Sequence, residues 1–262
     1  MYICVCGIFF VILQPDLNNV RIIMAEQLKQ STRIQTSILN GVEKKALVWL
    51  ANHMPSWMTS DILTVIGIFG AFLCGLGFAL THFGIYWLWL TVGGLVVNWF
   101  GDSLDGTFAR VHNQQRPLYG YYLDHNADTI TEGFMFIGAG ISPLMHMSIA
   151  MAIYAAYLAM TVYVSINAHI KSEFKLTYGK LGPTEFRLII ALANIVLMYV
   201  PFLTTYQLTV DLLGQTYIFG SLDLIGIVIL IVLTIIYLNS FFTDLKWFAE
   251  KDPLIKHEEE KQ

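Results

Sequence analysis

Four aspartates stand near one another in the sequence at spacings that suit metal binding. Asp102 and Asp105 are three residues apart, and Asp124 and Asp128 are four apart. Residues at either spacing share one face of a helix, and the short linker between the pairs predicts two antiparallel neighbouring helices. Converging carboxylates repel one another or take up protons unless a cation compensates their charge. Because carboxylate oxygens suit Mg²⁺ or Mn²⁺, we expect a divalent metal site, and four negative charges favour two ions.

Small residues and one arginine accompany the aspartates. Gly106, Ala109 and Gly120 each lie one helical turn from an aspartate and leave room for a ligand to approach the backbone. Arg110 adds a cation that can contact a phosphate through two nitrogen atoms. Carboxylates, a metal, small residues and an arginine together predict a binding site for a diphosphate.

The stretch from Asp102 to Asp128 resembles the signature of the CDP-alcohol phosphatidyltransferase family. It reads D-x-x-D-G-x-x-A-R, then nine residues, then G-x-x-x-D-x-x-x-D. The resemblance implies that Asp128 is the general base for the acceptor hydroxyl as well as a metal ligand. It also implies metal ligands at Asp102, Asp105 and Asp124, a cytidine nucleotide pocket at Gly106, Ala109 and Gly120, and phosphate contacts from Arg110.

The implied reaction is attack of an alcohol on the phosphorus of a CDP-linked donor, which releases CMP. The implied partners are the donor, an alcohol acceptor and membrane lipids, with no nucleic acid, and the family is often dimeric. We favour CDP-diacylglycerol as donor. The alternative is CDP-choline or CDP-ethanolamine donating to a lipid alcohol such as diacylglycerol, because Gly182-Pro183-Thr184-Glu185 resembles a stretch in the eukaryotic choline and ethanolamine phosphotransferases.

Three further residues are candidates for substrate contacts. Asn98 lies one turn before Asp102 on the same face, where it either contacts the nucleotide or bonds a neighbouring helix. Glu185 and Arg187 follow Pro183 and Thr184, which begin a helix, and we expect them on the acceptor side of the site.

Two other classes of function compete with an enzyme. Intramembrane aspartates also mark the paths of cation transporters and channels, but such a path needs polar groups through the whole membrane depth. Here the outer halves of the predicted spans are almost wholly apolar, with Asp223 as an exception. A non-catalytic scaffold of the same fold is disfavoured because all four aspartates are present.

The composition predicts an all-α polytopic membrane protein. Of the 262 residues, 56 % are hydrophobic and 13 % are charged, whereas soluble domains carry about 25 % charged residues. A helix needs about 20 apolar residues to cross a bilayer. Six stretches meet this criterion, near Asp61–Leu80, Ile85–Leu104, Leu123–Ile141, Met145–Ile170, Glu185–Thr205 and Tyr217–Phe242.

Basic residues support this count of spans. With the N-terminus in the cytoplasm, all 15 Lys and Arg residues fall on the cytoplasmic side, as the positive-inside rule predicts. Both termini and the aspartates are then expected at the cytoplasmic face. Before the first span, Thr36 to His53 has apolar residues at helical spacing, which predicts an amphipathic helix in the membrane interface.

The chain is expected to have three parts: an N-terminal arm (1–35), a membrane domain (36–250) and a charged tail (251–262). The arm is expected to be disordered. Its apolar run is too short to span a bilayer and lacks the features of a signal peptide. Met24 is therefore a candidate start of translation.

Overall fold

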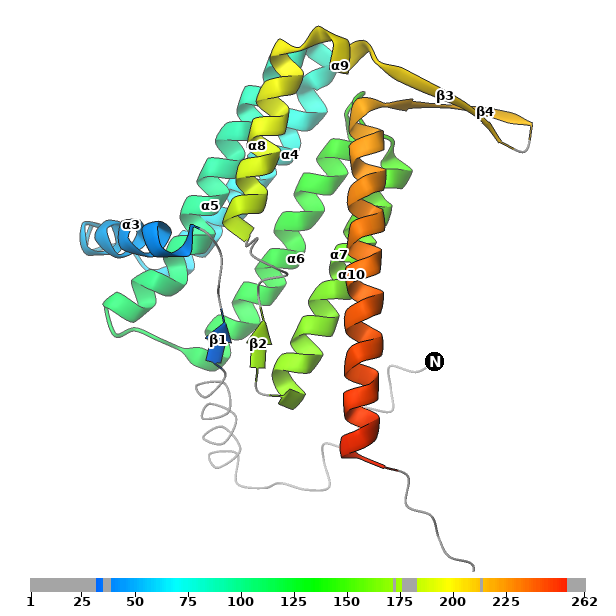
Figure 1. Cartoon of the computed structure of the whole chain (residues 1–262). Helices are drawn as coiled ribbons and strands as arrows, with labels where there is room; N and C mark the ends of the chain where they lie inside the picture. The colour runs from blue at the N-terminus through cyan, green and yellow to red at the C-terminus, as the bar shows by residue number, and fades with distance from the viewer. Residues whose placement is uncertain (1–31, 35–38, 172, 176–182, 213, 254–262) are drawn as a thin grey trace, which may run out of the picture.

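The computed structural model describes residues 32–34, 39–171, 173–175, 183–212 and 214–253 (Figure 1). The fold is mostly helical, as predicted. The helices are α3 (Asn40–Asn52), α4 (Ser60–Leu80), α5 (Leu88–Val111), α6 (Pro117–Ile141), α7 (Met147–Lys171), α8 (Pro183–Tyr199), α9 (Pro201–Thr205) and α10 (Ser221–Lys251). Two 3₁₀ turns, Thr81–Phe83 and Ile85–Trp87, connect α4 to α5.

The structure also contains four short strands, which were not predicted, among the described residues. β1 (Thr32–Ile34) pairs in parallel with β2 (Glu173–Lys175), and so joins the N-terminal segment to the connection between α7 and α8. β3 (Gln207–Leu212) pairs with β4 (Gln215–Gly220) as an antiparallel hairpin. The hairpin extends away from the helices beside the start of α10 (Figure 1).

The hairpin corrects the predicted start of the last span, which was placed at Tyr217. α10 begins at Ser221, because residues 215–220 form strand β4. Polar Gln207, Thr209 and Asp211 alternate with apolar residues, which is the period of a strand rather than of a helix. Gly214 has a φ of +77°, which a glycine adopts without strain in the turn.

Proline divides another predicted span. The stretch Glu185–Thr205 was expected to be one helix, but α8 ends at Tyr199 and α9 begins at Pro201. Val200 precedes the proline with φ −115° and ψ 86°, outside the helical region. This is the restriction that a proline places on the residue before it.

Three helical segments in the described part of the chain are long and apolar enough to cross a membrane. They are Ser60–Phe83, Met147–Asn167 and Ser221–Lys251. Of the other candidates, α5 and α6 carry the aspartates, and α8 has 17 residues. The count of six spans stays a prediction.

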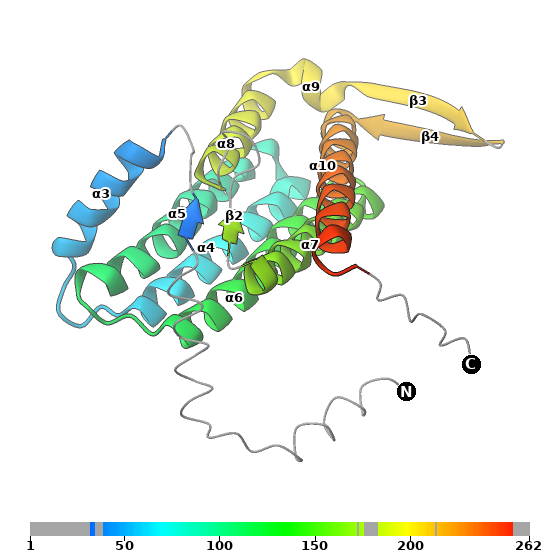
Figure 2. The same ribbon diagram turned by 60° about the horizontal axis from the view of Figure 1, so that its bottom comes forward.

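Helix α4 is the centre of the packing. It packs against both α5 and α6 (Figures 1 and 2). Helix α7 packs against both α6 and α10, and α8 packs against α5. Glycines allow this close approach: a Cβ at Gly101 would lie 2.3 Å from the backbone nitrogen of Gly67, and one at Gly138 would lie 2.3 Å from the Cα of Gly75. Small residues at helix interfaces are typical of membrane proteins, where packing itself drives association.

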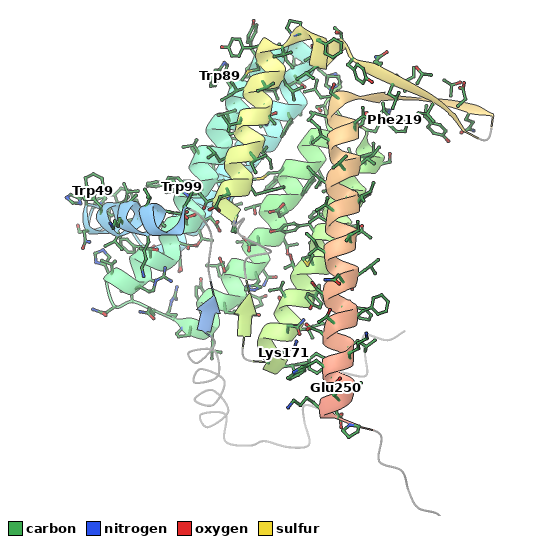
Figure 3. The ribbon with its side chains drawn as sticks, viewed as in Figure 1. Trp49, Trp89, Trp99, Lys171, Phe219 and Glu250 are labelled. Atoms are coloured by element: carbon green, nitrogen blue, oxygen red, sulfur yellow. The ribbon has the colours of Figure 1, made fainter. Side chains whose placement is uncertain are left out.

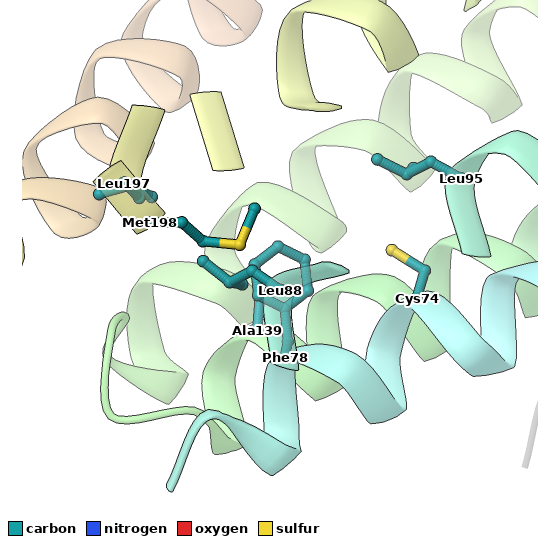
Figure 4. Close-up of a cluster of buried hydrophobic side chains, with 7 residues drawn as sticks. All are labelled: Cys74, Phe78, Leu88, Leu95, Ala139, Leu197 and Met198. Atoms are coloured by element: carbon teal, nitrogen blue, oxygen red, sulfur yellow. The ribbon is translucent and has the colours of Figure 1, made fainter. Parts of the chain in front are cut away.

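Two apolar clusters fill the space between the helices. One joins α4, α5, α6 and α8 (Figure 4) and comprises Cys74, Phe78, Leu88, Leu95, Ala139, Leu197 and Met198. The other joins α3 and the connection after it to α4 and α5, and comprises Leu47, Ala51, Met58, Leu63, Leu104 and Phe108. The second cluster includes Leu104, which precedes Asp105 in the sequence. It therefore holds in place the second half of α5, which carries Asp102 and Asp105.

Helix α3 crosses α5 at that end (Figure 1). It covers residues 40–52 of the predicted amphipathic stretch, whose positions 36–38 lie outside the described residues. Leu47 and Ala51 are buried against α5 and its neighbours, while Val42, Ala46 and Trp49 form an exposed stripe. The helix thus has one face on the protein and a separate outward apolar stripe.

Candidate metal and phosphate site

Asp102, Asp124 and Asp128 come together in the half of the helical bundle that contains the last part of α5 and the first part of α6. Each offers one carboxylate oxygen, and these oxygens all lie within 4.8 Å of one another. Asp102 lies in the second half of α5, and the other two lie in the first half of α6. Carboxylates this close suit a shared divalent cation, because the oxygens can converge on one ion.

The support for this arrangement differs from the expectation in one respect. The two aspartate-bearing helices were predicted to be direct neighbours, but each packs chiefly against α4. Gly67, Gly70 and Gly101 bring α5 close to α4, and Gly75 and Gly138 bring α6 close to it. α4 therefore sets the separation of the aspartate pairs.

Asp105 has a different environment from the other three aspartates. Its Oδ2 accepts a hydrogen bond from Thr64 Oγ1 of α4 at 2.7 Å, and its Oδ1 accepts one from the Gly106 backbone N–H at 2.5 Å. Ser60 Oγ also donates to the Asp105 backbone carbonyl oxygen at 3.0 Å. The described residues thus place three carboxylates in one group and tie the fourth to the start of α4.

Arg187 reaches the aspartates from α8. Its Nη2 lies 2.5 Å from Asp102 Oδ2, and both side chains are largely buried. Glu185, two residues earlier, is 7 % exposed and accepts a hydrogen bond from the Leu39 backbone N–H at 2.9 Å. Of the two acceptor-side candidates, Arg187 contacts an aspartate, while Glu185 contacts the start of α3.

The nucleotide-side candidates lie along α5 and in the first turn of α6. Asn98 is 1 % exposed and donates from Nδ2 to the Gly67 carbonyl oxygen at 3.0 Å, which is the helix-bonding alternative. Arg110 Nη2 donates to Thr107 Oγ1 at 2.9 Å.

The three small residues of the motif differ in their surroundings. A Cβ at Gly106 would lie 3.4 Å from the Arg110 guanidinium, whereas one at Gly120 would meet nothing within 4 Å. Ala109 is half-buried. Space for a ligand is thus open around Gly120.

Several contributing residues were not predicted from the sequence. Thr64 binds Asp105, and Glu43 of α3 contacts Trp99 of α5. Each contact joins two side chains that are far apart in the sequence. No local sequence pattern therefore indicates them.

An exposed ion pair connects the start of α4 to the start of α6. Arg116 Nη2 lies 2.7 Å from both carboxylate oxygens of Asp61, and its guanidinium stacks on the Tyr119 ring at 3.7 Å. The hydrogen bond that the guanidinium donates to the Asp61 carboxylate raises the pKa of Arg116. Because the pair is exposed, we expect it to orient the connection between α5 and α6 rather than to stabilise the fold appreciably.

A cavity of about 390 Å³ lies at the opposite end of the bundle. It is lined by residues before α7, in α9 and around the start of α10, among them His146 and Asp223. His146 Nδ1 lies 2.7 Å from Asp223 Oδ2, and the His146 backbone N–H donates to Asp223 Oδ1 at 2.7 Å. None of the predicted site residues lines this cavity, so the chemistry of the carboxylates, rather than cavity size, identifies the candidate site.

The donor set fits the metal that the sequence predicts. Asp102, Asp124 and Asp128 offer only hard carboxylate oxygens, which Mg²⁺ and Mn²⁺ prefer to softer ligands. A second ion and a role for Asp105 as ligand stay predictions.

A comparison with protein families agrees with this reading. Residues 57–245 match the model of the CDP-alcohol phosphatidyltransferase family, which covers more than half of the chain. The chain belongs to this family of membrane-embedded transferases, and the predicted membership is confirmed.

Among curated proteins, the chain is similar to cholinephosphotransferase 1 of Bos taurus and of Homo sapiens. Each is 26 % identical over 146 residues, which cover 53 % of this chain and 36 % of the relative. Cholinephosphotransferase 1 of Mus musculus is 26 % identical over 148 residues. The chain thus spans about a third of the length of the curated relatives it matches.

Proposed function

We propose that this chain transfers a substituted phosphate from a CDP-linked donor to an alcohol hydroxyl, with release of CMP. The observation that carries the proposal is the convergence of Asp102, Asp124 and Asp128 within 4.8 Å, inside the family motif. Membership in the CDP-alcohol phosphatidyltransferase family supports the same reaction.

In the proposed step, the acceptor oxygen attacks the donor phosphorus that carries the transferred group. A new P–O bond forms, the anhydride P–O bond to CMP breaks, and the hydroxyl proton passes to the Asp128 carboxylate. A free hydroxyl is a weak nucleophile, so a positioned base accelerates the attack. When bound by Asp102, Asp124 and Asp128, a divalent cation supplies Lewis-acid polarisation of the phosphoryl oxygens and neutralises the leaving group.

Arg187 is proposed to contact the phosphate groups of the substrate. Its guanidinium already lies at the aspartates through its contact with Asp102. Its five N–H donors allow it to bind a carboxylate and a phosphate oxygen together. Glu185 is proposed to act less directly, because its carboxylate accepts a hydrogen bond from Leu39.

The carboxylates and Arg187 do not discriminate between the two types of donor, because both types carry the same diphosphate. The sequence reading favours CDP-diacylglycerol, whereas the relatives named cholinephosphotransferase support the CDP-choline or CDP-ethanolamine type. The Gly-Pro-Thr-Glu stretch supports the second type as well. We therefore propose that a CDP-linked amino alcohol be tested as the first donor.

The proposed membrane arrangement has six spans with the aspartates and both termini at the cytoplasmic side. The grouping of the basic residues supports this orientation. α3 is proposed to lie in the membrane interface, supported by its exposed stripe of Val42, Ala46 and Trp49.

The decisive experiment measures CMP release by the purified full chain in lipid nanodiscs containing diacylglycerol. CDP-choline, CDP-ethanolamine and CDP-diacylglycerol with a panel of polar alcohols are supplied separately, each with Mg²⁺ and with EDTA. We expect Mg²⁺-dependent CMP release and a phospholipid product with one donor type. If every donor is left intact under all of these conditions, the proposed function is wrong.

Asp128→Asn tests the proposed base. The amide cannot take a proton, and general-base catalysis contributes about 10²- to 10⁴-fold, so we expect kcat to fall at least that far. Asp211→Asn, on the exposed β3 strand, is a matched control that should leave kcat unchanged. Near-normal turnover by Asp128→Asn would refute the assignment.

A further inference from the structure

Glu43 connects three helices through one carboxylate oxygen. It lies in the first turn of α3 and is half-buried. Its Oε1 accepts hydrogen bonds from Trp99 Nε1 of α5 at 2.9 Å and from Thr184 Oγ1 of α8 at 2.6 Å. One side chain thus ties α3 to both α5 and α8. Figure 3 places Trp99 beside the start of α3.

A second carboxylate makes the reverse connection. Glu185 of α8 accepts a hydrogen bond from the Leu39 backbone N–H, at the N-cap of α3. The first turns of α3 and α8 therefore each receive a carboxylate from the other helix. Negative charge near a helix N-terminus is favoured by the helix dipole and by the unpaired backbone N–H groups there.

The connections made by Glu43 run alongside the contact between Arg187 and Asp102. Trp99 lies three residues before Asp102 on α5, and Thr184 lies three residues before Arg187 on α8. Residues three apart lie on one face of a helix. Glu43 consequently joins α5 to α8 one turn away from the place where Arg187 meets Asp102.

From this geometry we propose that Glu43 is a positioning residue for Arg187. It holds the first turn of α8 at the separation from α5 that directs the guanidinium to the aspartates. Helix α3 also carries the outward stripe of Val42, Ala46 and Trp49, which is proposed to contact the membrane interface. A change in the position of α3 at the membrane would therefore move the site through Glu43. The functional consequence rests on the proposed function.

Kinetics of substitutions at Glu43 test this role. Glu43→Ala removes the shared acceptor, and we expect kcat/KM to fall about 10- to 100-fold, because small misplacements of a binding group have effects of that order. Glu43→Gln keeps an acceptor oxygen for both donors and should restore most of the activity. Lys44→Ala, an exposed neighbour on α3, is the control and should behave as the wild type.

A double-mutant cycle separates positioning from general support of the fold. If Glu43 acts through Arg187, Glu43→Ala should cause little further loss in an Arg187→Lys background. An equal loss in both backgrounds would overturn the proposal. So would a Glu43→Gln enzyme as impaired as Glu43→Ala.

A structural measurement keeps the test independent of catalysis. Spin labels at Val96 of α5 and Leu192 of α8, both exposed, report the separation of these helices. We expect Glu43→Ala, but not Lys44→Ala, to broaden or shift this distance distribution. An unchanged distribution contradicts the proposal even if activity falls. A chain that releases no CMP but shows the shift would refute the proposed function and leave the positioning role standing.

Discussion

Asp102 combines two contacts that matter at the scale of single residues. One of its carboxylate oxygens lies beside Arg187 Nη2, and the group as a whole belongs to the triad with Asp124 and Asp128. A carboxylate has about four lone-pair positions on its two oxygens. Asp102 can therefore pair with Arg187 and still offer an oxygen to a cation, which makes the arginine part of the site rather than a competitor for it.

Substituting Arg187 by Lys tests what the guanidinium contributes. Lysine keeps the positive charge near Asp102 but loses the planar pair of donors that can bind two partners. A hydrogen bond to a charged group contributes about 1.5–3 kcal/mol, so we expect kcat/KM to fall by about tenfold or more. Wild-type kinetics would mean that Arg187 serves only to balance charge. Progress curves of CMP release over a range of donor concentrations distinguish these outcomes.

Thr64→Val tests the support of Asp105. The substitution removes the hydroxyl that donates to Asp105 Oδ2 but keeps the shape of the side chain. Residues that orient metal ligands typically change metal affinity about 10- to 100-fold when substituted. We expect the Mg²⁺ concentration for half-maximal activity to rise by about tenfold.

The control for this prediction is another threonine with a purely local hydrogen bond. Thr234 of α10 is exposed and donates to the Leu230 carbonyl oxygen of its own helix at 2.7 Å. Thr234→Val should leave the Mg²⁺ requirement unchanged. If Thr64→Val behaves in the same way, Asp105 does not depend on this contact for any role in metal binding.

At the scale of helices, α4 positions the two helices that carry the aspartates. It carries no carboxylate of the triad, yet it lies against both helices that do. Its glycines remove the side-chain bulk that would otherwise separate the backbones, and the Asn98 side chain adds a hydrogen bond to the Gly67 carbonyl oxygen. The distance between Asp102 and Asp128 therefore depends on contacts that both helices make with a third.

Gly101→Ala tests this dependence. The new Cβ would lie 2.3 Å from the Gly67 nitrogen and 2.5 Å from the Leu63 carbonyl oxygen, so the backbones must separate. Overpacking of this kind costs about 1–3 kcal/mol, and we expect a lower thermal unfolding midpoint in detergent and reduced activity.

Gly93→Ala provides the matched control on the same helix. A Cβ there meets nothing within 4 Å, and alanine favours a helix over glycine by about 1 kcal/mol. Its unfolding midpoint should be unchanged or higher. Equal behaviour of the two variants would show that the approach of α4 and α5 does not limit stability.

At the scale of the whole molecule, the two ends of the bundle have different characters. Helix α3 and the start of α6 lie away from α9 and the β3–β4 hairpin (Figure 1). The aspartates are in the second half of α5 and the first half of α6, and Arg187 is near the start of α8, so they belong to the half of the bundle that is farther from the hairpin. This separation suits an enzyme whose water-soluble substrate parts approach from one side of the membrane.

Cysteine accessibility tests the predicted orientation. Gln114→Cys lies in the connection between α5 and α6, and Gln215→Cys lies at the start of β4; both positions are exposed. In sealed cells or vesicles, an impermeant maleimide should label Gln215→Cys from the non-cytoplasmic side. Gln114→Cys should react only after the membrane is opened. The reverse pattern would contradict a cytoplasmic active site.

The sequence by itself was sufficient to identify the family and to predict that the chain is mostly helical. Both follow from local features: the spacing of the aspartates within two helices, and runs of apolar residues long enough to span a bilayer. The alternation of polar and apolar residues at 207–212 was also visible in the sequence. Residues 217–220 lack it and continue into a long apolar stretch, so they were assigned to the last span.

Only the tertiary structure showed which residues contact the predicted site residues. It placed Asp105 on Thr64 instead of in the triad, Arg187 on Asp102, and Glu185 on Leu39. Each is a contact between residues at least 41 positions apart in the chain. Local propensity and spacing determine which face of a helix a residue occupies. Only the packing of whole helices determines what that face meets.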